Sequence, residues 1–355
     1  MHRTTPGKSG QLKEMLLDKI RSGEYPVGGK LPSIRELVKE YNMCKFTVSQ
    51  VLGSLHEKGY IHLEHRRAAK VLRCPAKYRI GLFYMSSGIR YNFFWGEFFR
   101  GIHDEMKEYP EFELVELFNP KAGRCFDPSG VDGTLIMGSN DAKAVAANGK
   151  EITDHPMIYV YTCPQKGCFS GVTSDFSGVM QEYIRTMHSQ RCRNILFIDR
   201  VQNNSAAKDK LHCLRSAAEK YGLELRVLTF ERDGDIQDAV FSRVCELFNE
   251  RATPDGIILT SDRLAAPVFR AAHECGKKIP QEVKVAGIDN LSDNKFMVPS
   301  LTSVDLDRYG QGREAVRMLT DRIRDPKKHF EYKRFPAKII FRESLAWISE
   351  EKTSL

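Results

Sequence analysis

The feature that most restricts the fold of this chain is a long alternation of apolar runs and amphipathic helical segments. Strands are predicted at 80–85, 113–118, 133–137, 157–161, 194–198, 224–229, 256–259 and 283–288, and helices at 94–109, 179–189, 208–221, 236–251 and 265–275. This order predicts parallel sheets covered by helices on both faces. A stretch of about 280 residues suits two such lobes, with a ligand held at the carboxyl ends of the strands.

The first seventy residues follow another pattern, in which three helices precede two short strands. Apolar stripes predict helices at 10–22 and 46–58, on either side of a helix that opens at Ser33. Ser33 and Glu36 have the spacing of a capping box, which marks the start of that middle helix. Residues 60–64 alternate between apolar and polar side chains, which predicts a strand, and residues 65–72 supply a basic turn and a return strand. Three helices and a two-stranded wing predict a winged helix-turn-helix, whose third helix enters the major groove of DNA.

The positive charge of the chain is confined to this first segment. The whole chain has 54 Lys+Arg against 46 Asp+Glu, a formal net charge of +8. Residues 1–77 hold 15 of the basic and 7 of the acidic residues, so the rest of the chain is neutral. A small basic module joined to a large neutral body indicates a nucleic-acid reader attached to another domain. The alternative is a solvated basic surface without a partner.

Several other classes of protein are disfavoured by what the sequence lacks. It has no apolar run long enough to span a bilayer, and its first residues lack the apolar core of a signal peptide, which predicts a cytoplasmic protein with no membrane partner. Nine cysteines without a Cys-x-x-Cys pair fit a reducing compartment. Motifs for phosphate loops, serine nucleophiles and zinc peptidases are missing. We therefore expect neither an enzyme nor a protein with a metal or other cofactor.

The N-terminal segment resembles the GntR family of bacterial regulators. The resemblance rests on Gly23–Leu37, which contains Leu-Pro-Ser-Ile-Arg-Glu-Leu, together with Thr47-Val48 and Gly59–Ile61. It implies DNA contacts at the start of the second helix, at the start of the third helix and at the wing. By position these contacts fall on Arg35, Lys45, Thr47, Ser49, Arg66 and Arg67. Cys44 and Phe46 depart from the family, which usually has serine and a small residue there.

These side chains suit different parts of a DNA duplex. Arg35 is able to bind a guanine edge bidentately or to clamp a phosphate, and both alternatives stay open. The hydroxyl of Thr47 suits a phosphate oxygen, which fixes register and carries no sequence information. Arg66 and Arg67 suit a narrow minor groove.

The body of the chain resembles the LacI/GalR effector domain, a member of the periplasmic-binding-protein-like class. The resemblance rests on Ser261–Ala265, Gly276–Asn290 and Pro299–Val304, and it extends over about residues 79–345. It implies a cleft lined by Asn92, Phe94, Trp95, Asp175, Lys210, Asp262 and Asp289. Aromatic rings suit the apolar faces of a sugar, and carboxylates with one cation suit its hydroxyls. Phe94 and Trp95 have the alternative of being plain core, and Asp175 that of capping a helix.

The predicted organisation is a winged helix-turn-helix at 1–73, a linker at 74–79, a two-lobed α/β effector domain with parallel sheets at 80–345, and a tail at 346–355. We predict a homodimeric repressor of sugar-utilisation genes that binds double-stranded operator DNA and takes a monosaccharide in its cleft. One alternative keeps the regulator and replaces the sugar with a nucleobase or nucleoside. Another is a sugar-binding or sugar-handling protein with an incidental basic head.

Overall fold

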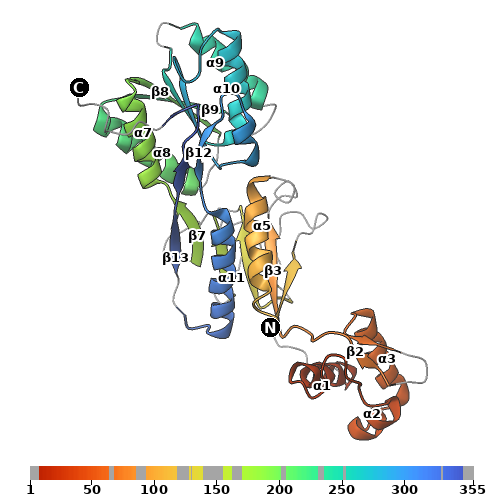
Figure 1. Cartoon of the computed structure of the whole chain (residues 1–355). Helices are drawn as coiled ribbons and strands as arrows, with labels where there is room; N and C mark the ends of the chain where they lie inside the picture. Colours follow the sequence, from red (N-terminus) through yellow and green to blue (C-terminus); the bar gives the residue numbers. More distant parts are fainter. Residues whose placement is uncertain are drawn as a thin grey trace. The chain divides into compact units, whose positions relative to one another are not determined.

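The computed structural model divides the chain into two compact units (Figure 1). The first comprises Met1–Arg79 with Tyr109–Leu114, and the second comprises Ile80–Glu108 with Val115–Leu355. The structure describes residues 8–63, 68–84, 93–117, 128, 130–138, 155–161, 170–200, 205–230, 236–250, 253–328 and 331–346. Within these ranges, no helix combines the length and the apolar character needed to cross a membrane.

The first unit contains three helices and a short two-stranded ribbon. Its elements are α1 (Lys8–Arg21), α2 (Ile34–Tyr41), α3 (Lys45–Glu57), β1 (Ile61–His62) and β2 (Lys70–Val71). The two strands pair antiparallel, with Ile61 opposite Val71. This arrangement confirms the predicted winged helix-turn-helix.

One apolar stripe on each helix builds the core of this unit. Leu12 and Leu16 of α1, Leu37 of α2, and Val48 and Leu55 of α3 have no exposed surface. Within α1 and within α3 they stand four and seven residues apart, so they share one face of their helix. Burial of that face holds α3 in place and leaves its opposite face at the surface.

Hydrogen bonds define both ends of α2, and those at its second end form the turn that leads to α3. The Glu36 amide donates to Ser33 Oγ over 3.4 Å, and the Ser33 amide donates to Glu36 Oε2 over 2.6 Å, which completes the predicted capping box. At the other end Asn42 adopts a left-handed conformation with φ 48°, and its amide donates to the Val38 carbonyl. The left-handed residue ends the helix and lets α3 begin three residues later.

The second unit has two lobes, each built on a six-stranded sheet. The sheet of the N-lobe has the order β13-β7-β6-β5-β3-β4. Its strands are β3 (Tyr78–Tyr84), β4 (Phe112–Glu116), β5 (Gly133–Met137), β6 (Met157–Val160), β7 (Ser170–Asp175) and β13 (Tyr332–Pro336). The pairs β3–β5, β5–β6, β6–β7 and β7–β13 are parallel. Strand β3 begins at Tyr78, inside the stretch 74–79 that was predicted to be a linker.

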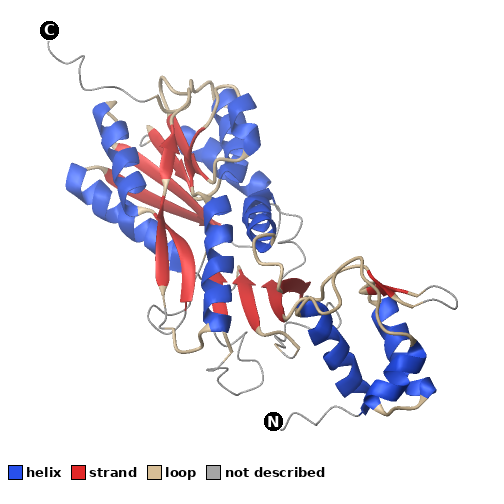
Figure 2. Ribbon diagram, turned by 60° about the horizontal axis from the view of Figure 1, so that its bottom comes forward, coloured by secondary structure: helices blue, strands red, loops and turns tan. Residues whose placement is uncertain are grey.

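The sheet of the C-lobe has the order β14-β12-β11-β10-β8-β9. Its strands are β8 (Asn194–Arg200), β9 (Glu224–Phe230), β10 (Gly256–Leu259), β11 (Lys284–Ile288), β12 (Thr302–Asp305) and β14 (Lys338–Ile340). Only β14, at the edge, runs antiparallel among the described pairs of this sheet. The helices of this lobe are α7 (Ser177–Ser189), α8 (Ser205–Tyr221), α9 (Ile236–Phe248) and α10 (Ala265–Glu274). Figure 1 shows α7 and α8 on one side of the strands and α9 and α10 on the other, and Figure 2 shows helices flanking strands, which confirms the predicted α/β lobes.

The chain passes from one lobe to the other at three points in its described part. It leaves the N-lobe after β7, returns after β12 to form α11 (Arg308–Arg324), and leaves again between β13 and β14. Each lobe is therefore assembled from segments that are distant in sequence. Short connections of this kind allow lobes to move as bodies about a hinge.

Helices α5 (Phe93–Met106) and α11 pack against each other at backbone contact in the N-lobe. A Cβ at Gly101 would lie 2.2 Å from the Tyr309 carbonyl oxygen, and one at Gly312 would lie 2.3 Å from the Phe98 carbonyl oxygen. Glycine is required at both places because any side chain would push the helices apart. The pair holds the first residues of α5 beside the first residues of α11, where side chains of the candidate ligand site are found.

Seven elements of the second unit were not predicted. They are the strands β7, β12, β13 and β14, the helix α11, and two short 3₁₀ helices, η1 (Asp262–Leu264) and η2 (Ser292–Phe296). Strand β7 reads Ser-Gly-Val-Thr-Ser-Asp and is nonetheless buried over its first five residues, because it lies between β6 and β13 in the N-lobe sheet. The predicted strands and helices between residues 80 and 288 are present, with ends that differ by up to three residues.

Candidate nucleic-acid interface and ligand site

The start of α3 presents three of the six residues predicted to contact DNA. Lys45 and Ser49 are exposed, and Thr47 is half-buried. The hydroxyl Oγ1 of Thr47 lies 3.1 Å from Sγ of Cys44, the residue that precedes the helix. Hydrogen bonds from the Thr47 side chain and backbone lower the pKa of the Cys44 thiol. The α3 terminus therefore combines an exposed cation with hydroxyl groups, a set that suits phosphate oxygens and base edges.

Of the other three predicted DNA contacts, the structure describes one. Arg35 is exposed in the first turn of α2, directly after the capping box. Arg66 and Arg67, predicted at the tip of the wing, lie outside the described residues.

The aromatic residues predicted to line the ligand site are gathered at the start of α5. The ring centroids of Phe94 and Trp95 are 5.0 Å apart, and Tyr161, which follows β6, lies 5.1 Å from Phe94. Trp95 is buried against Phe98, with their centroids 5.3 Å apart, whereas Phe94 is only partly buried. Phe94 is thus the most accessible ring of this group. Asn92 lies outside the described residues.

Asp289 is the most strongly perturbed carboxyl group near these rings. It follows β11, is 4% exposed, and accepts a hydrogen bond of 2.6 Å from the Ser261 hydroxyl. Burial, together with the neighbouring Asp262 carboxylate, raises the pKa of Asp289 to about 7. Lys210 and the Ser261 hydroxyl oppose the shift without cancelling it. A buried carboxyl group poised near neutrality is typical of a functional site.

Lys210 supplies the predicted cation on the C-lobe side. Its ammonium group is buried within α8 and donates to the Thr260 side chain over 3.1 Å and to the Thr260 carbonyl over 3.3 Å. Burial lowers the pKa of Lys210, while the nearby Asp289 and Asp199 carboxylates act in the opposite direction. Lys210 and Asp289, which the resemblance places in the same cleft, therefore lie near enough for each charge to affect the pKa of the other.

Arg308 joins the two lobes and was not predicted. It is 6% exposed at the start of α11, and its guanidinium donates to the Phe94 carbonyl in the N-lobe over 3.2 Å and to the Asp289 carbonyl in the C-lobe. Its Cζ also lies 5.1 Å from the centroid of the Phe94 ring. We call Phe94, Trp95, Tyr161, Lys210, Asp289 and Arg308 the interlobe cluster.

Asp262 has a different setting from the one the resemblance implies. It is 4% exposed, and its carboxylate accepts hydrogen bonds from Asn294 Nδ2 over 2.6 Å, from the Ser303 hydroxyl over 2.8 Å and from the Leu291 amide over 3.1 Å. Burial raises the pKa of Asp262, and these donors act against that shift. The three donors lie just before η2 (Ser292–Phe296), within η2 and on β12, so the carboxylate holds the loop that follows β11 and Asp289 in place.

Asp175 is the last residue of β7, and its Oδ1 accepts from the Ser177 amide over 3.0 Å and from the Ser177 hydroxyl over 2.8 Å, at the first residue of α7. These two bonds lower the pKa of Asp175. The N-cap residue of α7 is Phe176, so the Asp175 carboxylate fixes the turn that leads into the helix from just before the cap.

Unusual backbone conformations concentrate around the interlobe cluster. Of the six described non-glycine residues with positive φ, four are Tyr161, Asp289, Asn290 and Asp307, at 73°, 121°, 44° and 46°. Each follows the carboxyl end of β6, β11 or β12. Strained backbone persists where surrounding structure enforces it, and it gathers at ligand sites. Among the described residues, no group of three or more His, Cys, Asp or Glu side chains is placed to hold a metal ion.

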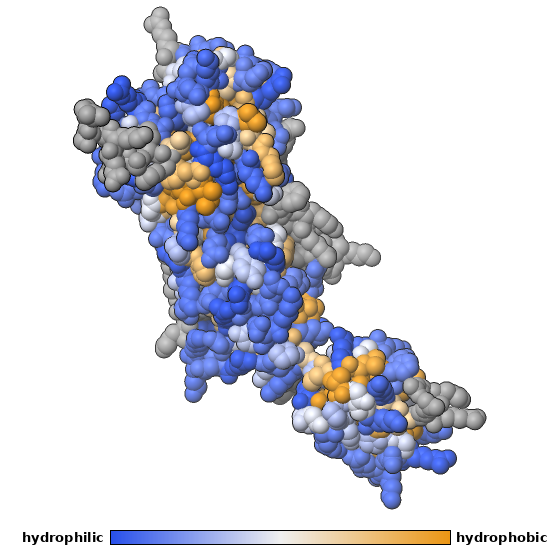
Figure 3. Space-filling view, viewed as in Figure 1, coloured by the Kyte–Doolittle hydropathy of each residue, from blue (hydrophilic) through white to orange (hydrophobic). Residues whose placement is uncertain are grey.

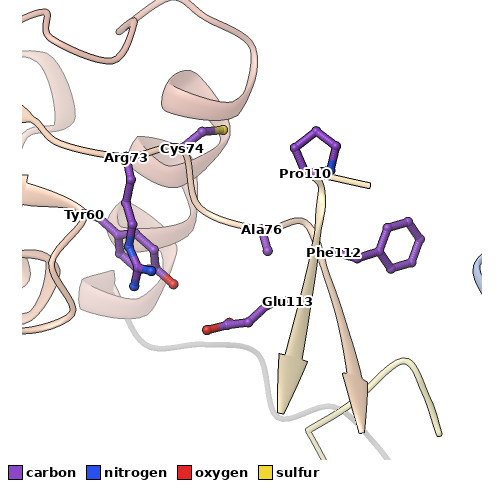
Figure 4. A pocket seen from close by; sticks show the side chains of 7 residues that line it. All are labelled: Tyr60, Arg73, Cys74, Ala76, Pro110, Phe112 and Glu113. Atoms are coloured by element: carbon purple, nitrogen blue, oxygen red, sulfur yellow. The ribbon is translucent and has the colours of Figure 1, made fainter. Parts of the chain in front are cut away.

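A small surface pocket in the first unit is separate from the predicted sites (Figure 4). It is lined by Tyr60, Arg73, Cys74, Ala76, Pro110, Phe112 and Glu113. The guanidinium of Arg73 lies 4.8 Å from the centroid of the Tyr60 ring and donates to the Lys58 carbonyl. The pocket contains none of the residues predicted to bind DNA or ligand.

The fold and the interlobe cluster define a two-lobed ligand-binding domain that follows a winged helix in the same chain. Residues 8–71 match the family described as bacterial regulatory proteins, gntR family, and residues 184–345 match the periplasmic binding protein-like domain. The chain therefore joins a GntR-family helix-turn-helix domain to a periplasmic-binding-protein-like domain, as the two resemblances predict.

Its relatives are transcriptional regulators. The chain is 26% identical to the HTH-type transcriptional regulator GalR of Lacticaseibacillus casei, over 60% of this chain and 66% of that protein. It is 25% identical to the ribose operon repressor of Halalkalibacterium halodurans, over 88% of this chain and 97% of that protein. The HTH-type transcriptional repressor PurR of Serratia proteamaculans is 23% identical, over 61% of this chain and 64% of that protein.

Solved structures show the same fold. A LacI family transcriptional regulator from Enterococcus faecalis with bound ribose matches with a TM-score of 0.63 and 20% identity, over 76% of this chain and 100% of that chain. The complex of the transcriptional regulator CelR with cellobiose matches with a TM-score of 0.63 and 18% identity, over 88% of this chain and 100% of that chain. At these identities the similarity establishes the architecture of the domain.

Proposed function

We propose that the protein is a one-component transcription regulator. Its first unit binds operator DNA as one half of a homodimer, and its second unit binds a small polar effector at the interlobe cluster. The observation that carries this proposal is the presence in one chain of a GntR-family helix-turn-helix and a buried polar cluster where strands of two lobes end. As a DNA-binding regulator it acts in the cytoplasm, and the named relatives that are repressors favour repression.

A monosaccharide is the effector that the cluster suits best. Asp289 and the Ser261 hydroxyl are able to accept and donate hydrogen bonds to sugar hydroxyls, and Lys210 adds a donor. The partly buried Phe94 ring offers an apolar surface for the face of a pyranose or furanose. A site of this kind rejects analogues that lack a hydroxyl, because its buried polar groups would be left unpaired.

A nucleobase or nucleoside is the second candidate. It is favoured by the PurR relatives and by the partly buried ring of Phe94, which is backed by Trp95 and Tyr161 and offers a face on which a flat base stacks. Asp289 with a pKa of about 7 is able to act as donor or acceptor toward a base edge.

The homodimer is supported by apolar side chains left at the surface of the C-lobe. Phe296 and Val298, at and after the end of η2, are 74% and 92% exposed. Figure 3 shows that hydrophilic residues cover most of the face it presents, with apolar residues in separate patches. Apolar residues as exposed as these suit contact with a second subunit. A dimer of winged helices requires an operator with two related half-sites.

Two measurements test the proposal. The first is the affinity of the full chain for fragments of its own genome as a function of salt. A regulator prefers a few sites upstream of genes, and its affinity falls with a slope of about −0.9 for each phosphate neutralised. Weak binding that is equal for all fragments would instead indicate a ligand-binding protein with an incidental basic head.

The second measurement is thermal unfolding in the presence of pentoses, hexoses, deoxy sugars, nucleosides and purines. A ligand at one hundred times its Kd stabilises the folded protein by about 2.7 kcal/mol. Stabilisation by one sugar supports the first candidate, and stabilisation by a purine or nucleoside alone rejects it in favour of the second.

A further inference from the structure

The recognition helix α3 carries a large apolar side chain on its outer surface. Phe46, the second residue of α3, is 75% exposed, which makes it the most exposed large apolar residue described in the first unit. Val27, Leu72 and Met15 follow at 58%, 48% and 39%. Phe46 makes no ring contact with any described residue and does not pack on the core of the unit. The ring therefore contributes nothing visible to the stability of the fold.

The helical period shows which residues accompany Phe46. Ser49 and Gln50 lie three and four residues further on and are both exposed, so the three side chains share one face of α3. Val48, Val51 and Leu55 occupy the opposite, buried face. The outer face is uncharged along its centre, while cations stand beside it at Lys45 and, in the first turn of α2, at Arg35.

We propose that Phe46 reads a thymine in the operator by packing against its 5-methyl group in the major groove. This inference rests on the proposed DNA-binding function and names one of its contacts. Side chains in the first turn of a recognition helix reach base edges. The thymine methyl is the apolar feature that a base pair presents in the major groove. A phenyl ring has no donor or acceptor, so this methyl is the one part of a base edge that it is able to recognise.

The flanking charges support DNA as the occupant of this face. Lys45 and Arg35 are placed to neutralise phosphates, and residues 1–77 carry the whole net charge of +8. A protein partner that buried the Phe46 ring would meet the same two cations on a surface with few other large apolar residues. The combination of an apolar centre and a cationic border fits a groove with methyl groups at its floor and phosphates along its edges.

The test is a cycle that removes the two apolar groups separately. The full-length protein selects its operator from a random DNA library, and each thymine of the selected site is replaced in turn by deoxyuridine, which lacks the methyl group. For the wild type we expect a loss of about fourfold in affinity at one thymine of each half-site, the factor that corresponds to burial of one methyl group. For F46A the same replacement changes nothing further.

Two control variants separate this contact from other effects. F46L keeps an apolar side chain and retains part of the sensitivity to deoxyuridine. K45A weakens binding to all sequences and reduces the salt slope by about 1, with the deoxyuridine effect intact. Because Phe46 is exposed, F46A should unfold at the temperature of the wild type, which checks that the helix is unchanged.

Three results would overturn the inference. They are equal deoxyuridine effects in the wild type and in F46A, a selected operator in which no thymine is sensitive, and an F46A variant with wild-type affinity. If another protein binds the Phe46 surface instead of DNA, F46A keeps wild-type DNA affinity, which is the third of these results. Failure of the proposed function looks different, because the library then yields no preferred sequence at all.

Discussion

The outer face of α3 and the interlobe cluster are both suited to binding, and they differ in their access to water. On α2 and α3, Arg35, Lys45 and Ser49 are exposed. In the cluster, Asp289 and Arg308 are 4% and 6% exposed. Exposed charges cost the folded state almost nothing and act on a partner through long-range attraction that salt weakens. Buried charges act at short range and must be held by other parts of the protein.

The difference shows in the pKa values and in the backbone. Burial raises the pKa of Asp289 to about 7 and lowers that of Lys210, while four residues around the cluster adopt positive φ. The cluster is therefore stabilised by the lobes that surround it, whereas the α3 face depends on the core beneath it alone. Substitutions in the cluster should change stability and ligand binding together, and substitutions on α3 should change DNA affinity alone.

The largest effect on stability is expected for a substitution of Asp262, whose hydrogen bonds hold the loop that follows Asp289. D262A removes the acceptor for three donors, on Leu291, Asn294 and Ser303, and leaves them buried without a partner. We expect the free energy of unfolding to fall by about 3 kcal/mol or more. Chemical denaturation with urea measures it. A loss below 1 kcal/mol, with ligand binding abolished, would show that Asp262 binds the ligand directly.

A pH-dependent effect is expected for Asp289. Its pKa is about 7 in the folded protein and about 3.9 in the unfolded chain, so the folded state holds the extra proton between these values. Stability from this group is therefore present at low pH and is lost as the pH rises from about 4 to 7, by roughly 1.4 kcal/mol per unit. The D289N variant has no carboxyl group at this position, so its stability does not fall with pH in this way. We also expect D289N to lose effector binding.

Urea denaturation of the wild type and D289N at pH 5 and pH 8 measures the effect. The difference in stability between the two proteins should move in favour of D289N at the higher pH. Parallel pH profiles for the two proteins would contradict the assigned role of Asp289.

On the exposed side of the comparison, R35A should weaken DNA binding by roughly 1–3 kcal/mol if Arg35 contacts a guanine, and by less if it contacts a phosphate. Loss of discrimination at one base pair identifies the base contact, and uniform weakening with a smaller salt slope identifies the phosphate contact. The temperature of unfolding should stay unchanged because the side chain is exposed. A marked loss of stability in R35A would contradict the expectation that substitutions of exposed residues on α2 and α3 change DNA affinity alone.

The smallest effect is expected for Ser33, which caps α2, the helix that precedes α3. S33A removes the hydroxyl that accepts from the Glu36 amide at the start of α2. We expect a loss of about 1 kcal/mol in the stability of the first unit, as for other cap residues. S33T, which keeps the hydroxyl, is the matched control. An S33A variant as stable as the wild type would mean that the cap is dispensable in this unit.

Most of the fold was predictable because hydrophobic period and turn chemistry act locally. The Ser33–Glu36 capping box and the strand at 133–137 appear as expected. Strand β7 escaped prediction because its small polar residues acquire their burial only from β6 and β13. Helix α11 was hidden by Gly310 and Gly312, and the latter is needed for backbone contact with α5. Both misses come from tertiary packing, which local patterns do not contain.

The sequence allowed single residues of the candidate site to be predicted, but not the contacts that these residues make with one another. Asp289 and Lys210, predicted separately as cleft residues, are buried, and each charge affects the pKa of the other. Arg308 was missed because its role depends on two partners, Phe94 and Asp289, that are distant from it in sequence. Asp262 and Asp175 have carboxylates already engaged by neighbouring donors, and such engagement is set by loop geometry.

The central claim is that effector binding and operator binding are coupled, and Arg308 connects the two lobes that an effector would bring together. The most direct test is the affinity of the full chain for its selected operator, with and without the ligand that stabilises it in thermal unfolding. Coupling predicts a change of about 5-fold to 150-fold in operator Kd, matched by an equal change in ligand Kd when operator is present. Identical operator affinity with and without saturating ligand would contradict it.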